Sequence, residues 1–308
     1  MESTNLVNEG FIDEGFSQRR GCAFVTGASG GIGVAVAKLL AERGCDVVAV
    51  YRTNAAVANE IVEFAHNLGR KAEAVSLDLT DADATVATVG EAAQAFGGIH
   101  TAVHAAGPFV PQEYLTRISP EQFHEQCVQD IGSFYNLLHA VGKHLREASA
   151  EDSEASAEKD GGSTEIDGRA KAGASGSGQL LDGHRNHGVG NLVAVTTCAT
   201  RRYPKRDVLS SGPKGAVEAL VRAFAREEGR FGVRANCVGP GMLTDGMASV
   251  LISSGEINEA AQAAARTNIA LGTFGSAQDI AEAVCFLAST RARYITGQML
   301  DIDGGYSI

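Results

Sequence analysis

The stretch CAFVTGASGGIG, residues 22–33, decides the fold of this chain. Its first five residues form an apolar run typical of a buried strand, and apolar residues at helical spacing follow the glycines as far as Arg43. Glycines after a strand permit a tight turn and let a pyrophosphate approach the backbone, while the next helix points its amide groups at the anion. A glycine loop alone also marks ordinary turns, but T-G-x-x-x-G-x-G between a strand and a helix predicts a dinucleotide-binding loop.

The rest of the chain continues this alternation of strand and helix. Further strands are predicted at Asp46–Tyr51, Ala72–Leu77, Thr101–Ala105, Asn191–Thr197, Val233–Val238 and Gln298–Asp301. Helices are predicted at Ile32–Arg43, Ala55–Leu68, Ala82–Phe96, Val208–Glu228, Glu256–Thr267 and Ala277–Ala288, with another long helix capped by Ser119. The strands are apolar runs without clean alternation, as in a parallel sheet covered by helices on both faces. The sequence therefore predicts a single α/β domain with a doubly wound, Rossmann-type parallel sheet.

Two segments depart from this pattern. Residues 1–20 are polar and contain scattered glycines, so we expect a flexible N-terminal arm before a domain that spans residues 21–308. Residues 147–189 are rich in Glu, Asp, Ser, Gly and Ala, and bury too little apolar surface to offset the entropy of ordering them. We expect a disordered acidic insertion there, on the side of the sheet opposite the glycine loop.

Charge and composition exclude several classes of protein. A net charge of −11 argues against nonspecific binding to nucleic acid or to an anionic membrane. No apolar run is long enough for a transmembrane helix, and the N-terminus has no secretory signal pattern. The six cysteines are widely spaced, so we expect reduced thiols and a cytoplasmic protein. No metal site is expected, because His184 and His187 lie in the predicted insertion.

The residue after the second strand predicts which nucleotide is bound. An acid at this place would hold the ribose 2′-hydroxyl of NAD(H), but the chain has Arg52, whose guanidinium suits the 2′-phosphate of NADP(H). A solvated surface arginine is the alternative. Asp78, at the end of the third strand, either accepts a hydrogen bond from the adenine amino group or caps the next helix. The cofactor-binding residues predicted in this half are Gly27, Ser29, Gly30, Gly31, Ile32, Gly33, Arg52, Asp78 and Leu79.

With these motifs in place, the chain resembles the short-chain dehydrogenases/reductases over residues 21–308 outside the insertion. The glycine loop matches in full, and so do segments after the insertion: residues 236–241 with Thr244, 271–275, 279–281, 295–298 and 301–305. The resemblance implies further cofactor contacts: Ala105, Ala106, Gly107, Lys214, Pro240, Gly241 and Thr244. It also implies a homodimer or homotetramer that assembles through the helices at Ser119–Arg146 and Val208–Glu228.

The catalytic positions depart from the family pattern, which usually has Asn, Ser and Tyr-x-x-x-Lys. Lys214 matches the lysine, but the tyrosine position holds Ser210, the serine falls on Thr197 and the asparagine on Gln129. Reduction of a carbonyl by hydride needs a positioned acid, and a serine hydroxyl is a far weaker acid than tyrosine. Conjugate reduction beside a thioester needs only donors that stabilise an enolate, which Ser210 and Thr197 can supply. The dienoyl-CoA reductase branch of the family also has serine at the tyrosine position, although the further tyrosine of that branch is Ala199 here.

A basic run follows the fifth strand, at the rim where ligands bind in open α/β sheets: Arg201-Arg202-Tyr203-Pro204-Lys205-Arg206. It suits the phosphate groups of coenzyme A or of a carrier-protein phosphopantetheine, or it is a solvated loop. Tyr203 is a further candidate donor, or it packs on the surface. The sequence is thus interpreted as an NADPH-dependent reductase of an activated double bond or carbonyl in an acyl thioester. An ordinary ketone/alcohol oxidoreductase and an inactive NADP(H)-binding regulatory subunit remain alternatives.

Overall fold

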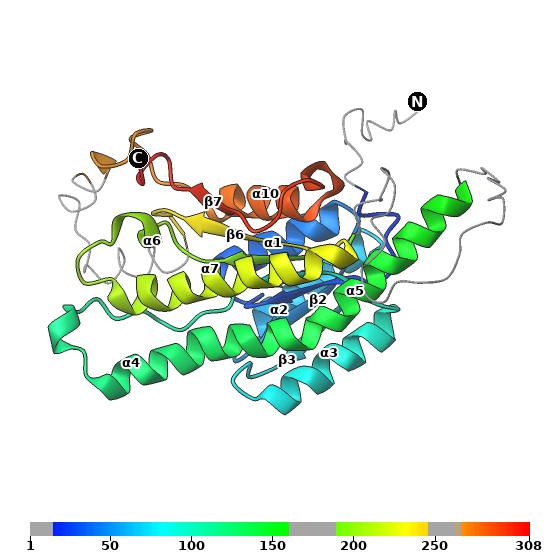
Figure 1. The fold of residues 1–308 in the computed structure, drawn as a ribbon, viewed down its shortest axis with the longest axis horizontal. Coiled ribbons are helices and arrows are strands. Elements are labelled where there is room, and N and C mark those ends of the chain that lie inside the picture. The colour runs from blue at the N-terminus through cyan, green and yellow to red at the C-terminus, as the bar shows by residue number, and fades with distance from the viewer. Residues whose placement is uncertain (1–14, 160–188, 246–262, 264–265) are drawn as a thin grey trace, which may run out of the picture.

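A seven-stranded parallel sheet forms the centre of the computed structural model, which describes residues 15–159, 189–245, 263 and 266–308. The strand order is β3-β2-β1-β4-β5-β6-β7, with every neighbouring pair parallel (Figure 1). The strands are β1 Cys22–Thr26, β2 Asp46–Tyr51, β3 Ala72–Ser76, β4 Ile99–His104, β5 Asn191–Val195, β6 Arg234–Pro240 and β7 Met299–Ile302. The predicted single-domain Rossmann-type fold is confirmed. The strand order reverses between β1 and β4, and a crevice at the carboxyl ends of such strands is the usual ligand site.

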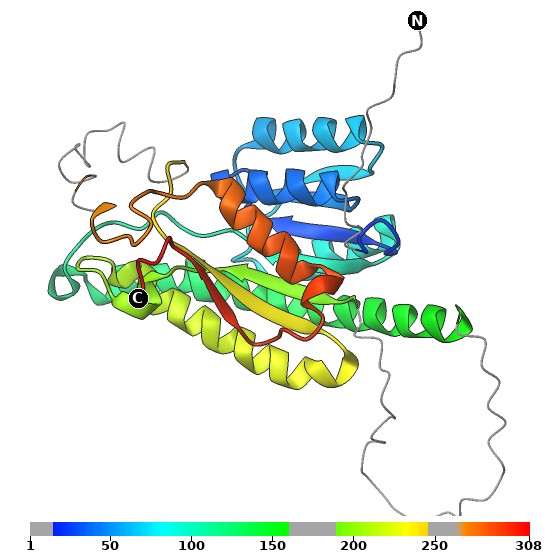
Figure 2. The same ribbon diagram turned by 90° about the horizontal axis from the view of Figure 1, so that it is seen from above.

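Helices cover both faces of the sheet (Figure 2). On one face, α1 (Gly31–Glu42) packs against α2 (Ala55–Asn67) and α10 (Ala277–Ala288). On the other face, α5 (Ser133–Lys159) packs between α3 (Ala82–Phe96) and α7 (Val208–Glu228). Short elements complete the chain: η1 Leu115–Arg117, α4 Pro120–Cys127, η2 Val128–Gly132, α6 Ala199–Arg202, η3 Gly229–Phe231 and η4 Thr290–Ala292. Among the described residues, no helix is long and apolar enough to cross a membrane.

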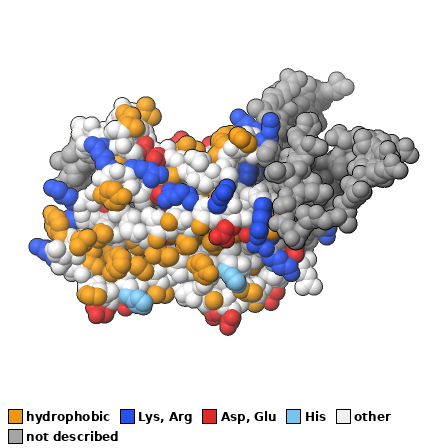
Figure 3. Space-filling view, in the orientation of Figure 1, with side chains coloured by type: hydrophobic (Ala, Val, Ile, Leu, Met, Phe, Trp, Pro, Cys, Tyr) orange, Lys and Arg blue, Asp and Glu red, His pale blue; other side chains and the backbone are white. Residues whose placement is uncertain are grey.

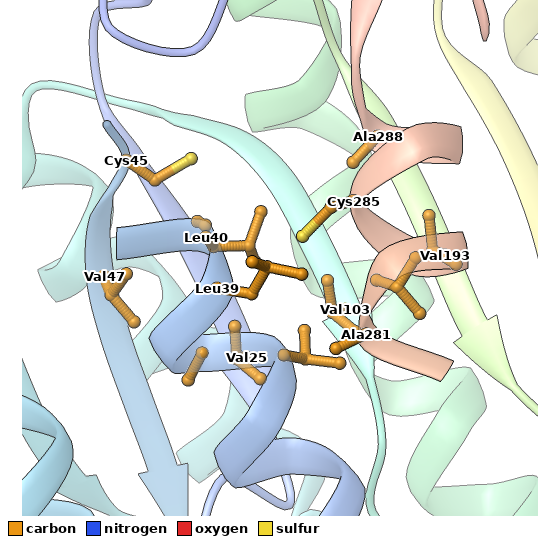
Figure 4. Close-up of a cluster of buried hydrophobic side chains, with 14 of the residues drawn as sticks. Val25, Leu39, Leu40, Cys45, Val47, Val103, Val193, Ala281, Cys285 and Ala288 are labelled. Atoms are coloured by element: carbon orange, nitrogen blue, oxygen red, sulfur yellow. The ribbon is translucent and has the colours of Figure 1, made fainter. Parts of the chain in front are cut away.

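The larger apolar core lies between the sheet, α1 and α10. Val25, Val103 and Val193 point from neighbouring strands toward Leu40 on α1 and Cys285 on α10 (Figure 4). Each of these five side chains is fully buried. A second core fills the space between the sheet and α3, α5 and α7. Because both faces of the strands are buried, their sequences read as continuous apolar runs.

The long helix predicted after Ser119 contains a wide turn. The Ser119 hydroxyl accepts a hydrogen bond from Gln122 N at 3.2 Å, and the Gln122 side chain accepts one from Ser119 N at 2.9 Å, which closes a capping box. The α-helix ends at Cys127, and a π-helical turn over Val128–Gly132 joins it to α5. Such turns insert one extra residue into a helix and frequently occur at functional sites.

Two predicted boundaries are corrected. The arm was expected to extend to residue 20, but Phe16 is buried and Arg19 donates a hydrogen bond to Ala288 O at 3.0 Å. The insertion was expected from residue 147, but α5 continues to Lys159, because Ala, Glu and Lys favour helix even without an apolar face. Ser149 is buried, and its hydroxyl accepts a hydrogen bond from Gly190 N at 3.1 Å.

Several predictions fall outside the described residues. These are the first fourteen residues of the arm, residues 160–188 of the insertion with both of its histidines, and most of the helix expected at Glu256–Thr267. All six cysteines lie in the described part of the chain, and the structure has no disulfide among them.

Candidate functional site

The glycine loop between β1 and α1 fits closely against the rest of the site. Gly27 has a φ of +69°, and a Cβ there would lie 2.5 Å from Ala105 O, so only glycine fits. A Cβ on Gly33 would lie 2.1 Å from Gly27 O, whereas a Cβ on Gly30 would lie 3.4 Å from that oxygen. The N-cap of α1 is Gly30, without a side-chain cap. The first amide groups of α1 therefore remain available to an anion.

A cavity of about 320 Å³ opens beside this loop at the carboxyl ends of the strands. Its lining includes nine of the predicted cofactor-binding residues: Gly27, Ser29, Gly30, Arg52, Asp78, Leu79, Ala105, Ala106 and Gly107. The other predicted residues lie outside this lining: Gly31, Ile32 and Gly33 within α1, Lys214 on α7, and Pro240, Gly241 and Thr244 at or after the end of β6. The lining also contains residues that the sequence did not single out as cofactor contacts: Val50, Tyr51, Thr53, Asn54, Leu77, Pro108, Gln129 and Ser133. Six of these eight residues lie at or just after the carboxyl ends of β2, β3 and β4, and that position in a parallel sheet was the signal that could have identified them.

Arg52 and Asp78 face the same cavity from neighbouring strands. Asp78 accepts hydrogen bonds from Thr80 N at 3.0 Å and from the Thr80 hydroxyl at 2.8 Å. These bonds, with the Arg52 charge as a smaller cause, hold the pKa of Asp78 below its ordinary value. Asp78 does not cap the next helix, because the N-cap of α3 is Asp81, which accepts a hydrogen bond from Ala84 N at 2.9 Å. An exposed cation and an ionised acceptor therefore stand at the rim of the cavity.

Lys214 lies beside Gly107, one of the residues that line the cavity. A Cβ on Gly107 would lie 3.4 Å from Lys214 Nζ, and this ammonium group pairs with Asp130 Oδ1 at 2.7 Å. The Asp130 side chain is 1% exposed and that of Lys214 is 12% exposed, so the ion pair is buried. The sequence assigned the family's asparagine position to Gln129, which lines the cavity, whereas the adjacent Asp130 is the residue that pairs with Lys214. Asp130 lies in the π-helical turn Val128–Gly132, which packs against α7.

His104 is a packing residue at the end of β4. Its Nδ1 lies 3.1 Å from the Thr26 hydroxyl, and its ring is 5.1 Å from that of Phe134. Burial, helped by the charge of Lys214, lowers the pKa of His104 to about 3, so the ring is neutral. Its Nε2 and Asp130 Oδ2 are buried and have no hydrogen-bond partner among the described residues. Buried polar atoms of this kind are usually satisfied by ordered water.

The structure places the remaining predicted catalytic residues as follows. Ser210 is in the first turn of α7, on the same helix as Lys214. The Thr197 hydroxyl accepts a hydrogen bond from Ala199 N at 3.1 Å, at the start of α6. Tyr203 is the C-cap of α6, with a φ of +48° and 70% of its surface exposed. The structure therefore places Tyr203 at the surface, away from the lining of the cavity.

The basic run after β5 is partly neutralised. Arg201 pairs with Glu218 at 3.3 Å and with Asp301 at 3.4 Å. The Arg202 guanidinium donates to Tyr306 O at 2.6 Å, and that of Arg206 donates to Gln112 O at 2.6 Å. Three of the four cations in this run therefore hold parts of the protein together, and the charge of Arg201 is compensated by two carboxylates, whereas the carbonyl partners of Arg202 and Arg206 leave their charges in place.

Comparisons with known proteins agree with this geometry. A family model described as Enoyl-(Acyl carrier protein) reductase matches residues 27–177 and 170–307. The chain is 30% identical to 3-oxoacyl-[acyl-carrier-protein] reductase from Staphylococcus aureus over 92% of its own length and 96% of that protein. It is 29% identical to versicolorin reductase 1 from Aspergillus parasiticus over 92% and 95% of the two chains. The crystal structure of a short chain dehydrogenase from Burkholderia cenocepacia in complex with NADP superposes with a TM-score of 0.74, at 27% identity, over 95% of this chain and all of the other.

Proposed function

The chain belongs to the short-chain dehydrogenase/reductase family, and from that premise we propose that it is an NADPH-dependent reductase of an activated double bond or carbonyl in an acyl thioester. The observation that carries this proposal is the cavity at the strand ends, which is lined by the glycine loop and Arg52, with Lys214 beside the lining residue Gly107. A cavity of this form suits a phosphorylated dinucleotide.

Residues of this chain fit NADP(H) at both ends of the cavity. Gly27, Ser29 and Gly30 form a backbone cradle for the pyrophosphate, which a Cβ on Gly27 would close. Arg52 would pair with the 2′-phosphate, and Lys214 would donate to the nicotinamide ribose. The related Burkholderia structure contains NADP, which supports this assignment. The nucleotide supplies a hydride when bound.

The altered donors favour a substrate whose reduction needs little acid. Ser210 stands where the family has tyrosine, and Asp130 compensates the charge of Lys214. Neither the Ser210 hydroxyl nor the paired Lys214 ammonium is a strong acid. Stabilisation of an enolate by the hydroxyls of Ser210 and Thr197 therefore suits this site better than protonation of an alkoxide. The names of the matched family model and of the Staphylococcus relative, both of which concern acyl carrier protein thioesters, support a thioester substrate.

An NADP(H)-binding regulatory subunit is the second candidate. The same Asp130–Lys214 pair favours this candidate. The charge of Lys214 is compensated by Asp130, and serine replaces the tyrosine that usually transfers the proton in this family. Reduction of simple ketones by the same donors is the remaining alternative within enzymes. A cytoplasmic location and a homo-oligomeric assembly complete the proposal.

The proposal is tested by following NADPH oxidation with enoyl-CoA, dienoyl-CoA, β-ketoacyl-CoA and simple ketone substrates, with nucleotide binding measured in parallel. Turnover of a thioester that is lost in Ser210→Ala or Lys214→Ala would support the reductase. Tight NADPH binding without any turnover would favour the regulatory subunit.

The nucleotide preference is tested separately. Arg52→Ala should weaken NADPH binding by about tenfold or more and leave NADH binding nearly unchanged, because one charge-assisted pair is lost. Arg226→Ala, on the last turn of α7, is the control and should change neither. Equal loss of both nucleotides in Arg52→Ala would contradict the NADP(H) assignment.

A further inference from the structure

The proposed donor Thr197 lies between β5 and the single helical turn α6. Its hydroxyl accepts a hydrogen bond from Ala199 N, the first amide of α6, at 3.1 Å. A hydroxyl has one hydrogen and two lone pairs, so this bond occupies a lone pair and leaves the hydrogen available to a substrate oxygen. The direction in which Thr197 donates therefore depends on how α6 is held.

The helix α7 supplies a buried acid that reaches α6. A helix of four residues is unstable by itself, so tertiary contacts must hold α6 in place. It packs against α7 (Figure 1). On α7, Glu218 is four residues after Lys214 and therefore lies on the same face of the helix. The Glu218 side chain is 3% exposed, so its carboxylate needs partners within the protein.

Glu218 binds two consecutive residues of α6. Its Oε1 accepts a hydrogen bond from the Thr200 hydroxyl at 2.6 Å, and its Oε2 accepts one from the Arg201 guanidinium at 3.3 Å. The Thr200 hydroxyl also lies 3.1 Å from Thr197 O, but its single hydrogen goes to the nearer, charged acceptor. The Thr200 amide donates to Thr197 O at 3.4 Å. The residue that Glu218 fixes is thus itself bonded to the backbone of Thr197.

Arg201 extends these contacts to the edge of the sheet. Besides Glu218, it pairs with Asp301 on β7 at 3.4 Å, so one guanidinium joins α6 to α7 and to β7. Arg222, one turn further along α7, also faces Glu218 at 3.8 Å, but this side chain is 54% exposed and contributes little. A buried carboxylate is costly without its partners, so α6 must stay where it satisfies Glu218.

From these contacts we propose that Glu218 is a positioning residue that acts through Thr200 and α6, and that it fixes the direction in which the Thr197 hydroxyl donates. This inference rests on the proposed function, in which Thr197 stabilises the enolate. A donor that is not held in place stabilises a transition state less than a preorganised one. Binding of NADPH should not depend on Glu218 or Thr200, because both lie outside the lining of the nucleotide cavity.

The first test needs no substrate. Hydrogen exchange of the Ala199 amide, measured by NMR in the NADPH-bound protein, reports its bond to the Thr197 hydroxyl. Thr200→Val should speed this exchange by about tenfold, because it removes the bond to Glu218, whereas Thr200→Ser keeps the hydroxyl and should not. Thr85→Val is the matched control, because it removes a buried hydroxyl of α3 that donates to a backbone carbonyl at 2.7 Å. Unchanged Ala199 exchange in Thr200→Val would overturn the inference.

The second test is NADPH oxidation with the thioester panel. Glu218→Ala and Thr200→Val should each lower kcat by about tenfold or more and leave NADPH affinity unchanged, because a displaced donor affects the transition state and not nucleotide binding. Thr200→Ser should retain the wild-type kcat. Glu228→Ala is the matched control, because Glu228 is a buried acid of the same helix that pairs with Arg146 on α5. Equal losses of kcat in Glu218→Ala and Glu228→Ala would contradict the proposal.

A double variant separates positioning from general loss of stability. In the Thr197→Ala protein, adding Thr200→Val should cause no further loss of kcat, because the hydroxyl that Thr200 helps to position is already gone. Additive losses would overturn the inference. If nothing in the panel is reduced although NADPH binds, the proposed reductase function fails, and the exchange of the Ala199 amide alone decides whether Glu218 and Thr200 hold Thr197.

Discussion

At the scale of single residues, the buried pair of Asp130 and Lys214 is the main departure from what the motifs implied. The sequence pointed to Gln129, which is exposed and lines the cavity, whereas the adjacent Asp130 is buried against Lys214. A buried carboxylate beside an ammonium adds little stability of its own, but removing one partner leaves an uncompensated charge. This pair therefore constrains both the fold of the site and the charge that it can present.

Asp130→Ala should lower the free energy of unfolding by about 3 kcal/mol, because it leaves the Lys214 charge buried without a partner. The double variant Asp130→Ala, Lys214→Met should recover much of this loss in urea unfolding. Lys143→Ala, which breaks an exposed pair with Glu147 at 3.6 Å, is the control and should cost less than about 0.5 kcal/mol. Equal costs for the buried and the exposed pair would show that Asp130 and Lys214 are not buried together.

His104 makes stability depend on pH. Its pKa is about 3 in the folded chain, below the ordinary value of 6.5, so the unfolded chain binds more protons between these values. Stability is fully present above about pH 6.5 and falls by up to about 1.4 kcal/mol per unit as pH decreases toward 3. Buried His100 acts in the same direction, so His104→Asn should reduce the slope without removing it. Parallel slopes for wild type and His104→Asn would contradict a neutral buried His104.

At the scale of elements, the junction of β1 and α1 was predicted well because it depends on local chemistry. A buried strand, a run of glycines and an apolar helical stripe are each visible in consecutive residues. The capping boxes at Ser119 and Ser276 are likewise local and mark the starts of α4 and α10. The π-helical turn after Cys127, which packs against α5 and α7, was not predicted from local sequence. The extension of α5 to Lys159 was missed, although Ala, Glu and Lys favour helix, because the low apolar content of this segment was interpreted as disorder.

Gly33→Ala tests the close approach of loop and helix. Its Cβ would lie 2.1 Å from Gly27 O, so backbone must move, and we expect a loss of about 3 kcal/mol in unfolding free energy together with loss of NADPH binding. Gly30→Ala is the matched control for stability, because its Cβ would lie 3.4 Å from the same oxygen and its φ of −89° suits alanine. A stable Gly33→Ala protein that binds NADPH would refute this account of the loop.

At the scale of the whole molecule, apolar side chains gather on the face formed by α4, α5 and α7 (Figure 3). Phe123 on α4, Val128 on the π-helical turn and Tyr135 on α5 are 44%, 43% and 54% exposed. Exposed apolar patches commonly mark protein interfaces. This is the surface through which the family resemblance predicts assembly.

Replacing Phe123 and Tyr135 by Glu should therefore dissociate the homo-oligomer, because two charges would be buried in its interface. Light scattering after size exclusion should shift from a multiple of the chain mass to a single chain of 32.0 kDa. Leu68→Glu, at a 44% exposed position at the end of α2, should leave the assembly intact. A wild-type protein that is already monomeric would contradict the prediction.

Residues 160–188 should be dispensable for nucleotide binding. The described residues on either side of this segment are Lys159, at the end of α5, and Val189, just before the amino end of β5, whereas the cavity lies at the carboxyl ends of the strands. A chain in which a short Gly-Ser linker replaces residues 160–188 should bind NADPH with unchanged affinity and unfold at the same urea concentration. Loss of NADPH affinity in this variant would show that the segment contributes to the site.

The sequence by itself determined the strands, most helix boundaries and the glycine loop, because periodicity, glycine geometry and caps act between residues close in the chain. Only the tertiary structure decided which side chains meet from distant elements. Asp130 faces Lys214 across two helices, Asp207 meets Gln112 from a separate loop, and Arg201 is neutralised by Glu218 and Asp301. Such contacts depend on helix rotation and packing, which residue spacing along one chain does not specify.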